Sequence, residues 1–244
     1  MKIIPLSEGS FTIDGTKDFV PFNTATDDLQ ERPRGSLLVE IQPFAIVMPN
    51  DIILLDTGLG FQDATGSLQI HHNLMNAGIQ PSDVTKVLLS HLHKDHAGGI
   101  GKNNRLHFPN AQYFIHQQEL DFALQKGAPS YDINDFEVLI NHPRCTLLQE
   151  SSGYINEHIR YEMPGGHCPY HLAFWLSDTE ETIFYGGDVA PQLQQMKHKF
   201  IAKYDYDGKV SMEQRARWWQ EGKDNQWTFL FYHDIKIPSF KAGI

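Results

Sequence analysis

The chain has few cysteines, no long hydrophobic run and no apolar stretch at its start. Its two cysteines, Cys145 and Cys168, are too few for a disulfide scaffold and agree with a reducing compartment. No apolar run approaches the roughly 18 residues that a membrane-spanning helix needs, and residues 1–7 do not resemble a signal peptide. We therefore expect a cytoplasmic protein with no membrane partner.

Basic residues are also scarce. Lys and Arg number 20 against 30 Asp and Glu, which gives a formal net charge of -10 at pH 7. A chain of this charge repels phosphate backbones, so we expect a small-molecule substrate and no nucleic-acid partner. The 244 residues suit one domain spanning residues 1–244, because neither an internal repeat nor a low-complexity linker divides them.

Histidine, in contrast, is concentrated in one short segment. Residues 90–99 read Ser-His-Leu-His-Lys-Asp-His-Ala-Gly-Gly and follow the apolar run Val87–Leu89. Where a chain leaves a strand still extended, residues two apart point the same way, so His91 and His93 can hold one metal ion together. Asp95 and His96 lie in the turn that follows and face a second position nearby. The segment thus predicts part of a metal site.

Other polar residues stand just past the ends of apolar strands. Asp56, Asp188 and His233 each follow such a run directly, and His167 lies in a glycine-rich loop after an extended run. Strands that share a sheet deliver the residues at their ends to one rim, so these side chains are expected to meet the histidine segment there.

This placement predicts two groups of three ligands and one bridging carboxylate. One group comprises His91, His93 and His167. The other comprises Asp95, His96 and His233. Asp188 is expected to bridge the two ions through its two oxygens. Imidazole and carboxylate ligands favour a pair of catalytic divalent ions over a closed structural site, which would be rich in cysteine. Zinc is the expected metal, with iron or manganese as alternatives.

The remaining pattern predicts alternating strands and helices. Residues 37–48 are expected to be one extended run that forms a hairpin with residues 52–55. Helices are expected over residues 67–77, ended by Gly78, and over 117–125 after a strand at 111–116. The capping-box pattern of residues 211–214 predicts the start of a further helix, and residues 228–232 form the last predicted strand.

The motifs together resemble those of the metallo-β-lactamase superfamily. His-x-His-x-Asp-His at 91–96, Asp56 in Leu-Asp-Thr-Gly, and His167, Asp188 and His233 in their loops arise in that family's order over roughly residues 50 to 235. The resemblance implies an α/β (α+β) fold, a four-layer αβ/βα sandwich with the metals at one edge of two packed sheets. It also implies that Asp56 orients the ligand loop by hydrogen bonding.

Details of the motifs resemble one branch more than others. His96 stands where the best-known β-lactamases have arginine, and Asp188 where they use cysteine, which disfavours antibiotic hydrolysis. Residues 108–113, the insertion at about 117–157 and residues 233–235 look most like the lactonase and organophosphate-hydrolase branch. Pro191, however, replaces the tyrosine of quorum-quenching lactonases, so the resemblance leaves the substrate open. Relatives in this branch are often dimers, which makes a homodimer an expectation.

The expected mechanism is metal-assisted hydrolysis of a small ester or lactone. Two ions roughly 3.5–4 Å apart hold a bridging water and lower its pKa toward about 7, so that hydroxide attacks the carbonyl. Asp95 and Asp56 are the expected catalytic residues, the first to orient the nucleophile and move its proton, the second to support the ligand loop.

Three other activities of the same superfamily stay open. A thioesterase of the glyoxalase II kind and a small phosphoester hydrolase would use the same pair of ions. An oxidoreductase of the persulfide-dioxygenase kind would use a single iron, and it would leave Asp95, His96 and His233 without a purpose.

Overall fold

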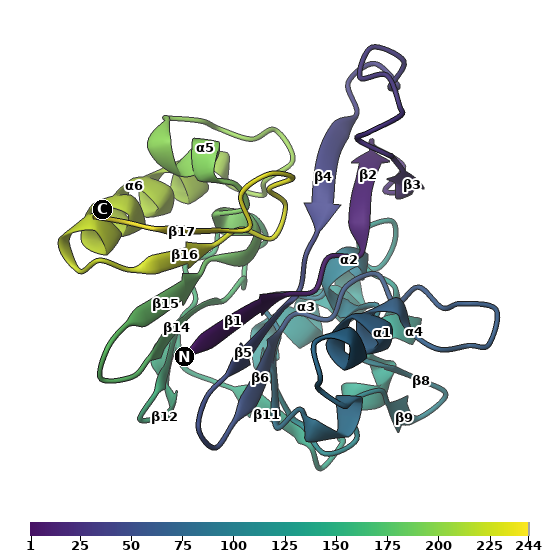
Figure 1. Cartoon of the computed structure of the whole chain (residues 1–244), viewed down its shortest axis with the longest axis vertical. Coiled ribbons are helices and arrows are strands. Elements are labelled where there is room, and N and C mark those ends of the chain that lie inside the picture. Colours follow the sequence, from purple (N-terminus) through teal and green to yellow (C-terminus); the bar gives the residue numbers. More distant parts are fainter. Residues whose placement is uncertain (244) are drawn as a thin grey trace.

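Two six-stranded sheets face each other at the centre of the molecule, and helices cover their outer faces (Figure 1). The structure, a computed structural model, describes residues 1–243. The four layers follow in the order helix, sheet, sheet, helix. They confirm the predicted αβ/βα sandwich.

The first sheet has the strand order β1-β5-β6-β7-β10-β11 and is parallel from β6 to β11. Its strands are β1 (Lys2–Pro5), β5 (Phe44–Val47), β6 (Ile52–Leu55), β7 (Lys86–Leu88), β10 (Gln112–His116) and β11 (Cys145–Leu148). The connections between its parallel strands contain α1 (Gln69–Asn76), α2 (Lys94–Ala97), α3 (Gln117–Lys126) and α4 (Ile133–Phe136). Parallel strands need such crossovers, and these place the helices on the outer face of the sheet.

The second sheet has the order β12-β13-β14-β15-β16-β17, with only β15 and β16 parallel. Its strands are β12 (Ser152–Asn156), β13 (Ile159–Glu162), β14 (Ala173–Ser177), β15 (Thr182–Tyr185), β16 (Thr228–Leu230) and β17 (Ser239–Lys241). The crossover from β15 to β16 contains α5 (Leu193–Lys197) and α6 (Gly208–Asp224). Short 3-10 segments lie at Pro81–Asp83, Glu137–Leu139 and Gly187–Val189.

The alternation of side chains along each strand separates three hydrophobic clusters. In β6, Ile53 and Leu55 point between the sheets, whereas Leu54 points toward the helices of the first sheet. On the far side of the second sheet, the Trp218 ring of α6 lies 4.8 Å from that of Phe184. Strands buried on both faces explain why the apolar runs in the sequence are continuous.

A three-stranded arm projects beyond the sandwich at the upper right of Figure 1. It contains β2 (Gly9–Ile13), β3 (Val20–Pro21) and β4 (Leu37–Ile41), in the order β3-β2-β4. The prediction of one extended run over residues 37–48 is therefore wrong. The run is divided at Pro43, which lacks the amide hydrogen needed to continue a ladder, so that only β5 forms the predicted hairpin with β6. A second small hairpin joins β8 (Gly101–Lys102) to β9 (Arg105–Leu106).

Two helix predictions had different outcomes. The helix expected over 67–77 is present as α1, and Gly78 follows it with a φ of +81°. The start predicted at Ser211 is wrong, since α6 begins at Gly208. The carboxylate of Asp207 accepts hydrogen bonds from the backbone N–H groups of Lys209 and Val210 at 3.1 and 3.0 Å and so caps the helix one turn earlier.

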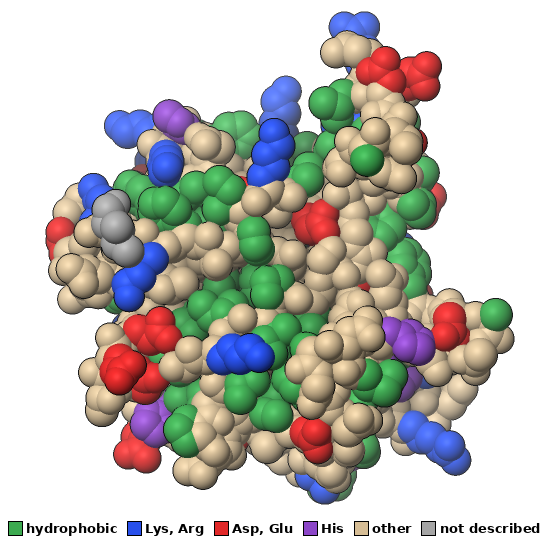
Figure 2. All heavy atoms as spheres, viewed as in Figure 1, with side chains coloured by type: hydrophobic (Ala, Val, Ile, Leu, Met, Phe, Trp, Pro, Cys, Tyr) green, Lys and Arg blue, Asp and Glu red, His purple; other side chains and the backbone are tan. Residues whose placement is uncertain are grey.

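The surface carries charges of both signs. Figure 2 shows acidic and basic side chains interspersed over one face, with hydrophobic side chains between them. Among residues 1–243, no helix has both the length and the apolar composition to cross a bilayer.

Candidate metal centre

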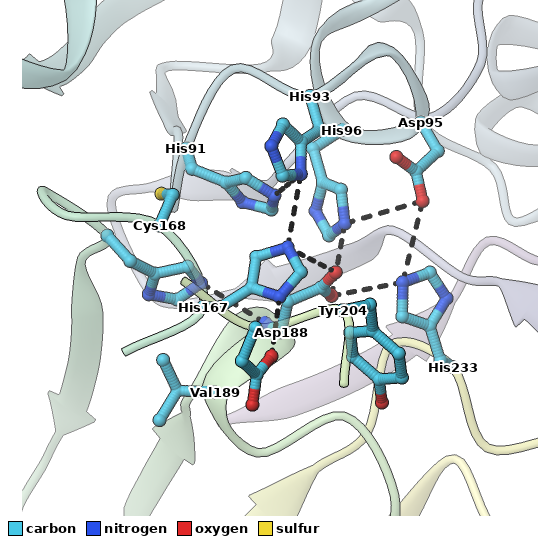
Figure 3. A network of polar contacts seen from close by, with 12 residues as sticks. His91, His93, Asp95, His96, His167, Cys168, Asp188, Val189, Tyr204 and His233 are labelled. Atoms are coloured by element: carbon cyan, nitrogen blue, oxygen red, sulfur yellow. Dashed lines mark hydrogen bonds and ion pairs between the residues drawn. The ribbon is translucent and has the colours of Figure 1, made fainter. Parts of the chain in front are cut away.

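The predicted ligands meet at the rim where strands of both sheets end (Figure 3). Asp56 directly follows β6, and the histidine segment follows β7. Asp188 lies in the 3-10 turn after β15, and His233 lies shortly after β16. His167 comes from the loop between β13 and β14. The rule that strand ends share a rim therefore brings all of these side chains to one place.

The first predicted group has three imidazole nitrogens that converge. Nδ1 of His93 lies 2.9 Å from Nε2 of His91 and 3.1 Å from Nε2 of His167. His91 and His167 are buried, and His93 is half-buried and lines the cavity. Three ring nitrogens aimed at a common point form a set of ligands for a divalent ion.

The second predicted group combines a carboxylate with two imidazoles. Oδ2 of Asp95 lies 3.4 Å from Nε2 of His233 and 3.6 Å from Nε2 of His96. All three side chains are buried. This group lies beside the first, because His93 and Asp95 are two residues apart at the start of α2.

Asp188 lies between the two groups and turns one oxygen to each. Its Oδ2 is 3.3 Å from Nε2 of His167, in the first group. Its Oδ1 is 3.1 Å from Nε2 of His96 and 3.0 Å from Nε2 of His233, in the second. The preceding residue, Gly187, has a φ of +47°. A Cβ there would lie 2.7 Å from the His171 ring, so only glycine fits this approach.

Within residues 1–243, two buried atoms at the centre have no hydrogen-bond partner. They are Nε2 of His96 and Oδ1 of Asp188, which face each other without forming a hydrogen bond. Unpaired buried polar atoms are costly, and an ion coordinated by both would satisfy them. The donor set of imidazole nitrogens and carboxylate oxygens thus fits two divalent metal ions.

In three of the histidines, the ring nitrogen that points away from the centre is held by a group outside it. Nδ1–H of His96 donates to Oδ2 of Asp56 at 2.8 Å, and Nδ1–H of His167 donates to Oδ1 of Asp205 at 3.0 Å. Nδ1–H of His233 donates to the backbone oxygen of Glu40 at 2.7 Å. These contacts leave Nε2 of each ring facing the centre, which is how ligand histidines are oriented in metal sites.

The carboxylate of Asp56 accepts four hydrogen bonds. Besides His96, it accepts hydrogen bonds from the backbone N–H of Ser90 at 2.7 Å, from the Ser90 hydroxyl at 2.6 Å and from the Tyr185 hydroxyl. Its φ of +55° turns the chain so that the side chain reaches this position. This is the placement expected for a residue that orients the ligand loop.

Burial and neighbouring charges set the protonation of the centre. Burial, with the nearby rings, holds the pKa values of His91 and His93 well below their ordinary value. Burial would also lower the pKa of His96, but Asp188, Asp95 and Asp56 outweigh it and raise that pKa well above 6.5. Conversely, three histidines hold the pKa of Asp188 well below its ordinary value despite its burial. The lowered pKa of Asp188 favours a negative charge between the two groups.

Several supporting residues were not found from the sequence. Glu119 of α3 is fully buried, and its carboxylate accepts hydrogen bonds from Leu92 N–H at 3.1 Å, Tyr131 O–H at 3.2 Å and the Cys168 thiol at 3.4 Å. The Tyr131 ring in turn packs on His93, with centroids 4.7 Å apart. Glu119 is 27 residues from Leu92 in sequence, so no local pattern links it to the histidine segment.

Two aromatic rings support the second group and the bridging residue. The backbone N–H of Asp188 donates to Nε2 of His171 at 3.1 Å. The Tyr232 ring stacks on His96 at 4.0 Å, and its hydroxyl donates to the backbone oxygen of Asp95. His171 thus lies behind Asp188 in the fold.

A cavity of about 220 Å³ opens onto the centre. Its floor includes His93, Asp95, His167, Asp188 and His233. Its walls come from the arm, from the loop after Asp188 and from the segment around Phe200 and Tyr204. The residues at the floor are thus accessible to a small molecule.

Comparison with protein families finds one match to most of the chain. A family model described as the metallo-beta-lactamase superfamily matches residues 43–228. Among curated proteins, an N-acyl homoserine lactonase AttM of Azorhizobium caulinodans is 46% identical over 46 residues, which cover 19% of this chain and 16% of that protein. The match spans about a sixth of that relative's length.

Solved structures share the fold over nearly the whole chain. A probable metal-dependent hydrolase from Staphylococcus aureus has a TM-score of 0.81 and 21% sequence identity, covering 98% of this chain and 91% of that one. AidC, a dizinc quorum-quenching lactonase in complex with a product, has a TM-score of 0.75 and 20% identity, covering 97% and 88%. At this identity the likeness shows a common fold.

Proposed function

The chain belongs to the metallo-β-lactamase superfamily, and we propose that it is a dinuclear metal-dependent hydrolase of small esters or lactones. The observation that carries this proposal is the position of Asp188. One carboxylate oxygen faces each group of ligands, which is the arrangement required of a bridge between two ions. A site for one ion would leave one oxygen and one group without a use.

The chemistry depends on what two ions add to these residues. When bound, a pair of divalent ions lowers the pKa of a shared water toward about 7, polarises the substrate carbonyl and stabilises the leaving oxygen. Asp95 lines the cavity, and its Oδ2 lies 3.4 Å from Nε2 of His233. Its carboxylate orients the attacking water and accepts its proton.

Asp56 acts indirectly, through the residues that it holds in place. It fixes the His96 ring and the backbone of Ser90, so it holds the second group in place from a fully buried position. We therefore assign Asp95 as the catalytic acid–base group and Asp56 as a positioning residue.

The relatives support ester or lactone bonds as the substrate class. AidC is a dizinc lactonase, and the AttM relative is an N-acyl homoserine lactonase. The cavity of about 220 Å³ suits a small molecule. Zinc is the metal we propose, because nitrogen and carboxylate ligands with open positions suit it.

A panel of substrates tests the proposal. The zinc-loaded protein is assayed with aryl esters, acyl-homoserine lactones, phosphotriesters and glutathione thioesters. We expect turnover of esters or lactones that chelation abolishes and zinc restores. Activity confined to thioesters or to phosphoesters would contradict the proposed substrate class. One iron per chain with oxygen consumption would contradict hydrolysis and indicate an oxidoreductase.

A further inference from the structure

The cavity wall beyond the proposed ligands is positively charged. Among residues 1–243, the charged side chains that line the cavity besides Asp95, Asp188 and the histidines are Lys17 and Lys94. The chain as a whole has a net charge of -10. This part of the cavity wall therefore differs in sign from the protein around it, which a neutral substrate would not require.

Lys17 reaches the cavity from the tip of the arm. It closes the turn that follows β2, where its N–H donates to the backbone oxygen of Asp14 at 3.2 Å. Asp14, Gly15 and Thr16 in this turn are exposed, whereas Lys17 is half-buried. The reason is that its side chain lies along the cavity wall. Burial and His167 are the main causes that lower the pKa of His93, and the charge of Lys17 adds to them.

The backbone at Lys17 is strained for a residue with a side chain. Its φ is +62°, in the left-handed region that favours glycine. Glycine would fit this turn at lower cost, so stability does not account for a lysine here. A role of the ammonium group in the cavity would account for a lysine at this cost.

The two lysines differ in their surroundings. Lys94 lies near Asp135. Burial raises the pKa of Asp135 to about 7, and the positive charge of Lys94 acts in the opposite direction, because it favours the charged carboxylate. Within residues 1–243 neither Lys17 nor Lys94 forms an ion pair with a carboxylate, whereas Lys86 pairs with Asp51. The Lys17 ammonium is thus available to a ligand.

Apolar side chains surround this charge. Ile13, Phe19, Leu37, Leu38, Val39 and Phe200 line the same cavity. A small molecule that fills the cavity therefore contacts hydrocarbon side chains along the arm. At the tip of the arm it meets the positive charge of Lys17, near the proposed metal ligand His93.

We propose that Lys17 is a specificity-determining residue that selects esters or lactones bearing a negatively charged group on an apolar chain. This inference rests on the proposed function and narrows its substrate class. The monoester of a dicarboxylic acid is a simple member of that class, since it combines a hydrolysable bond, a hydrocarbon chain and a carboxylate.

Matched substrates and variants test the role of Lys17. The zinc-loaded protein hydrolyses 4-nitrophenyl hexanoate and a series of mono-4-nitrophenyl esters from succinate to pimelate, of which the adipate differs from hexanoate by a carboxylate in place of the terminal methyl. The variants are Lys17→Gly, which removes the charge and suits the left-handed backbone, and Lys17→Arg, which keeps the charge. Lys209→Gln removes an exposed charge of α6, outside the cavity, as the control.

We expect the unaltered chain and Lys17→Arg to favour the best anionic ester about fivefold in kcat/KM through a lower KM, the size of one ion pair at a half-exposed site. The preference disappears in Lys17→Gly, persists in Lys209→Gln and weakens with added salt. A preference for hexanoate over every anionic ester, or an anionic preference that survives in Lys17→Gly, would overturn the role of Lys17.

A binding measurement separates this inference from the proposed function. Adipic acid monoanilide and hexananilide resemble the two substrates but carry an amide in place of the ester. Calorimetry measures the affinity of each variant for the two compounds. Tighter binding of the anionic compound by the unaltered chain and Lys17→Arg, but not by Lys17→Gly, would support the role of Lys17 even if the protein hydrolyses none of the esters. If none of the esters is hydrolysed, the proposed function is wrong, and the binding preference is then judged from the affinities alone.

Discussion

Nδ1 of His96 lies 2.8 Å from Oδ2 of Asp56, and both side chains are fully buried. This contact joins the end of β6 to the start of α2. It leaves Nε2 of His96 facing Asp188, so a residue outside the candidate centre determines how one of its ligands is presented.

Replacing Asp56 with Asn tests this relationship. Asn tolerates the φ of +55°, but it lacks the negative charge that keeps the proton on Nδ1 of His96. We expect the affinity for the second ion to fall about 10–100-fold while the first ion is retained. Chelator competition measures both affinities, with Asp205→Asn as the matched change beside His167, where the first ion should weaken instead. Two ions bound as tightly as in the unaltered chain would contradict the role of Asp56.

Glu119 is expected to support the first group of ligands. In Glu119→Met, the oxygen that accepts from both the N–H of Leu92 and the hydroxyl of Tyr131 is lost, so the backbone at Leu92 loses part of its support. We predict a loss of stability of about 1–3 kcal/mol and about tenfold weaker binding of the first ion. Thermal unfolding and metal titration measure these effects.

Cys168→Ala is the control for Glu119, because it removes only the weak thiol contact at 3.4 Å. It should change metal affinity little. Equal effects of the two substitutions would show that cavity formation, and not the hydrogen bonds to Leu92 and Tyr131, explains the result.

A close backbone approach holds the loop after Asp56 against the end of α2. Gly60 has a φ of +70°, and a Cβ there would lie 2.0 Å from the backbone oxygen of Gly98. Gly66 has a φ of +83° with nothing within 4 Å. We expect Gly60→Ala to lower the free energy of unfolding by about 2–4 kcal/mol, and Gly66→Ala by about 1 kcal/mol from its backbone conformation alone. Denaturant unfolding would contradict this account if the two losses were equal.

Glu8 should make stability depend on pH. Burial raises its pKa from 4.5 to about 7 in the folded chain. The folded state therefore binds more protons than the unfolded state between these values, and stability falls as the pH rises from about 4.5 to about 7.

Glu8→Gln removes this dependence and keeps an oxygen that can accept from the N–H of Leu59, at 2.7 Å from the Glu8 carboxylate. At pH 8 the variant should be more stable by on the order of 2 kcal/mol, with little difference at pH 4.5. Urea unfolding of the metal-free protein at both pH values measures this, and Glu157→Gln, at an 86% exposed side chain, is the control. An equal gain at both pH values would mean that Glu8 does not titrate in this range.

The centre was more predictable from the sequence than its surroundings. Alternation along a strand placed His91 beside His93, and the shared rim of parallel strands placed Asp56 near them; both rules are local. Asp205, in contrast, is 38 residues from His167 and lies in a loop, so no period points to it. The arm was missed because Pro43 divides an extended run whose hydrophobic pattern continues through it.

The helix start at Asp207 was missed for a similar reason. Ser211 and the residues after it match a capping box, but Asp207 accepts two hydrogen bonds from the backbone one turn earlier. Local patterns of this kind compete, and the sequence does not say which of two caps is used. Long-range partners such as Glu119 become visible only once α3 is packed against the histidine segment.

Stepwise metal titration tests the central claim, that the residues around Asp188 hold two cooperating ions. The metal-free protein receives zinc in fractions of an equivalent while bound metal and ester or lactone hydrolysis are followed together, in the unaltered chain and in Asp188→Asn. We predict two ions per chain, activity that develops with the second equivalent, and loss of both tight binding and activity in Asp188→Asn. Full activity at one ion per chain, or unchanged activity in Asp188→Asn, would contradict the account.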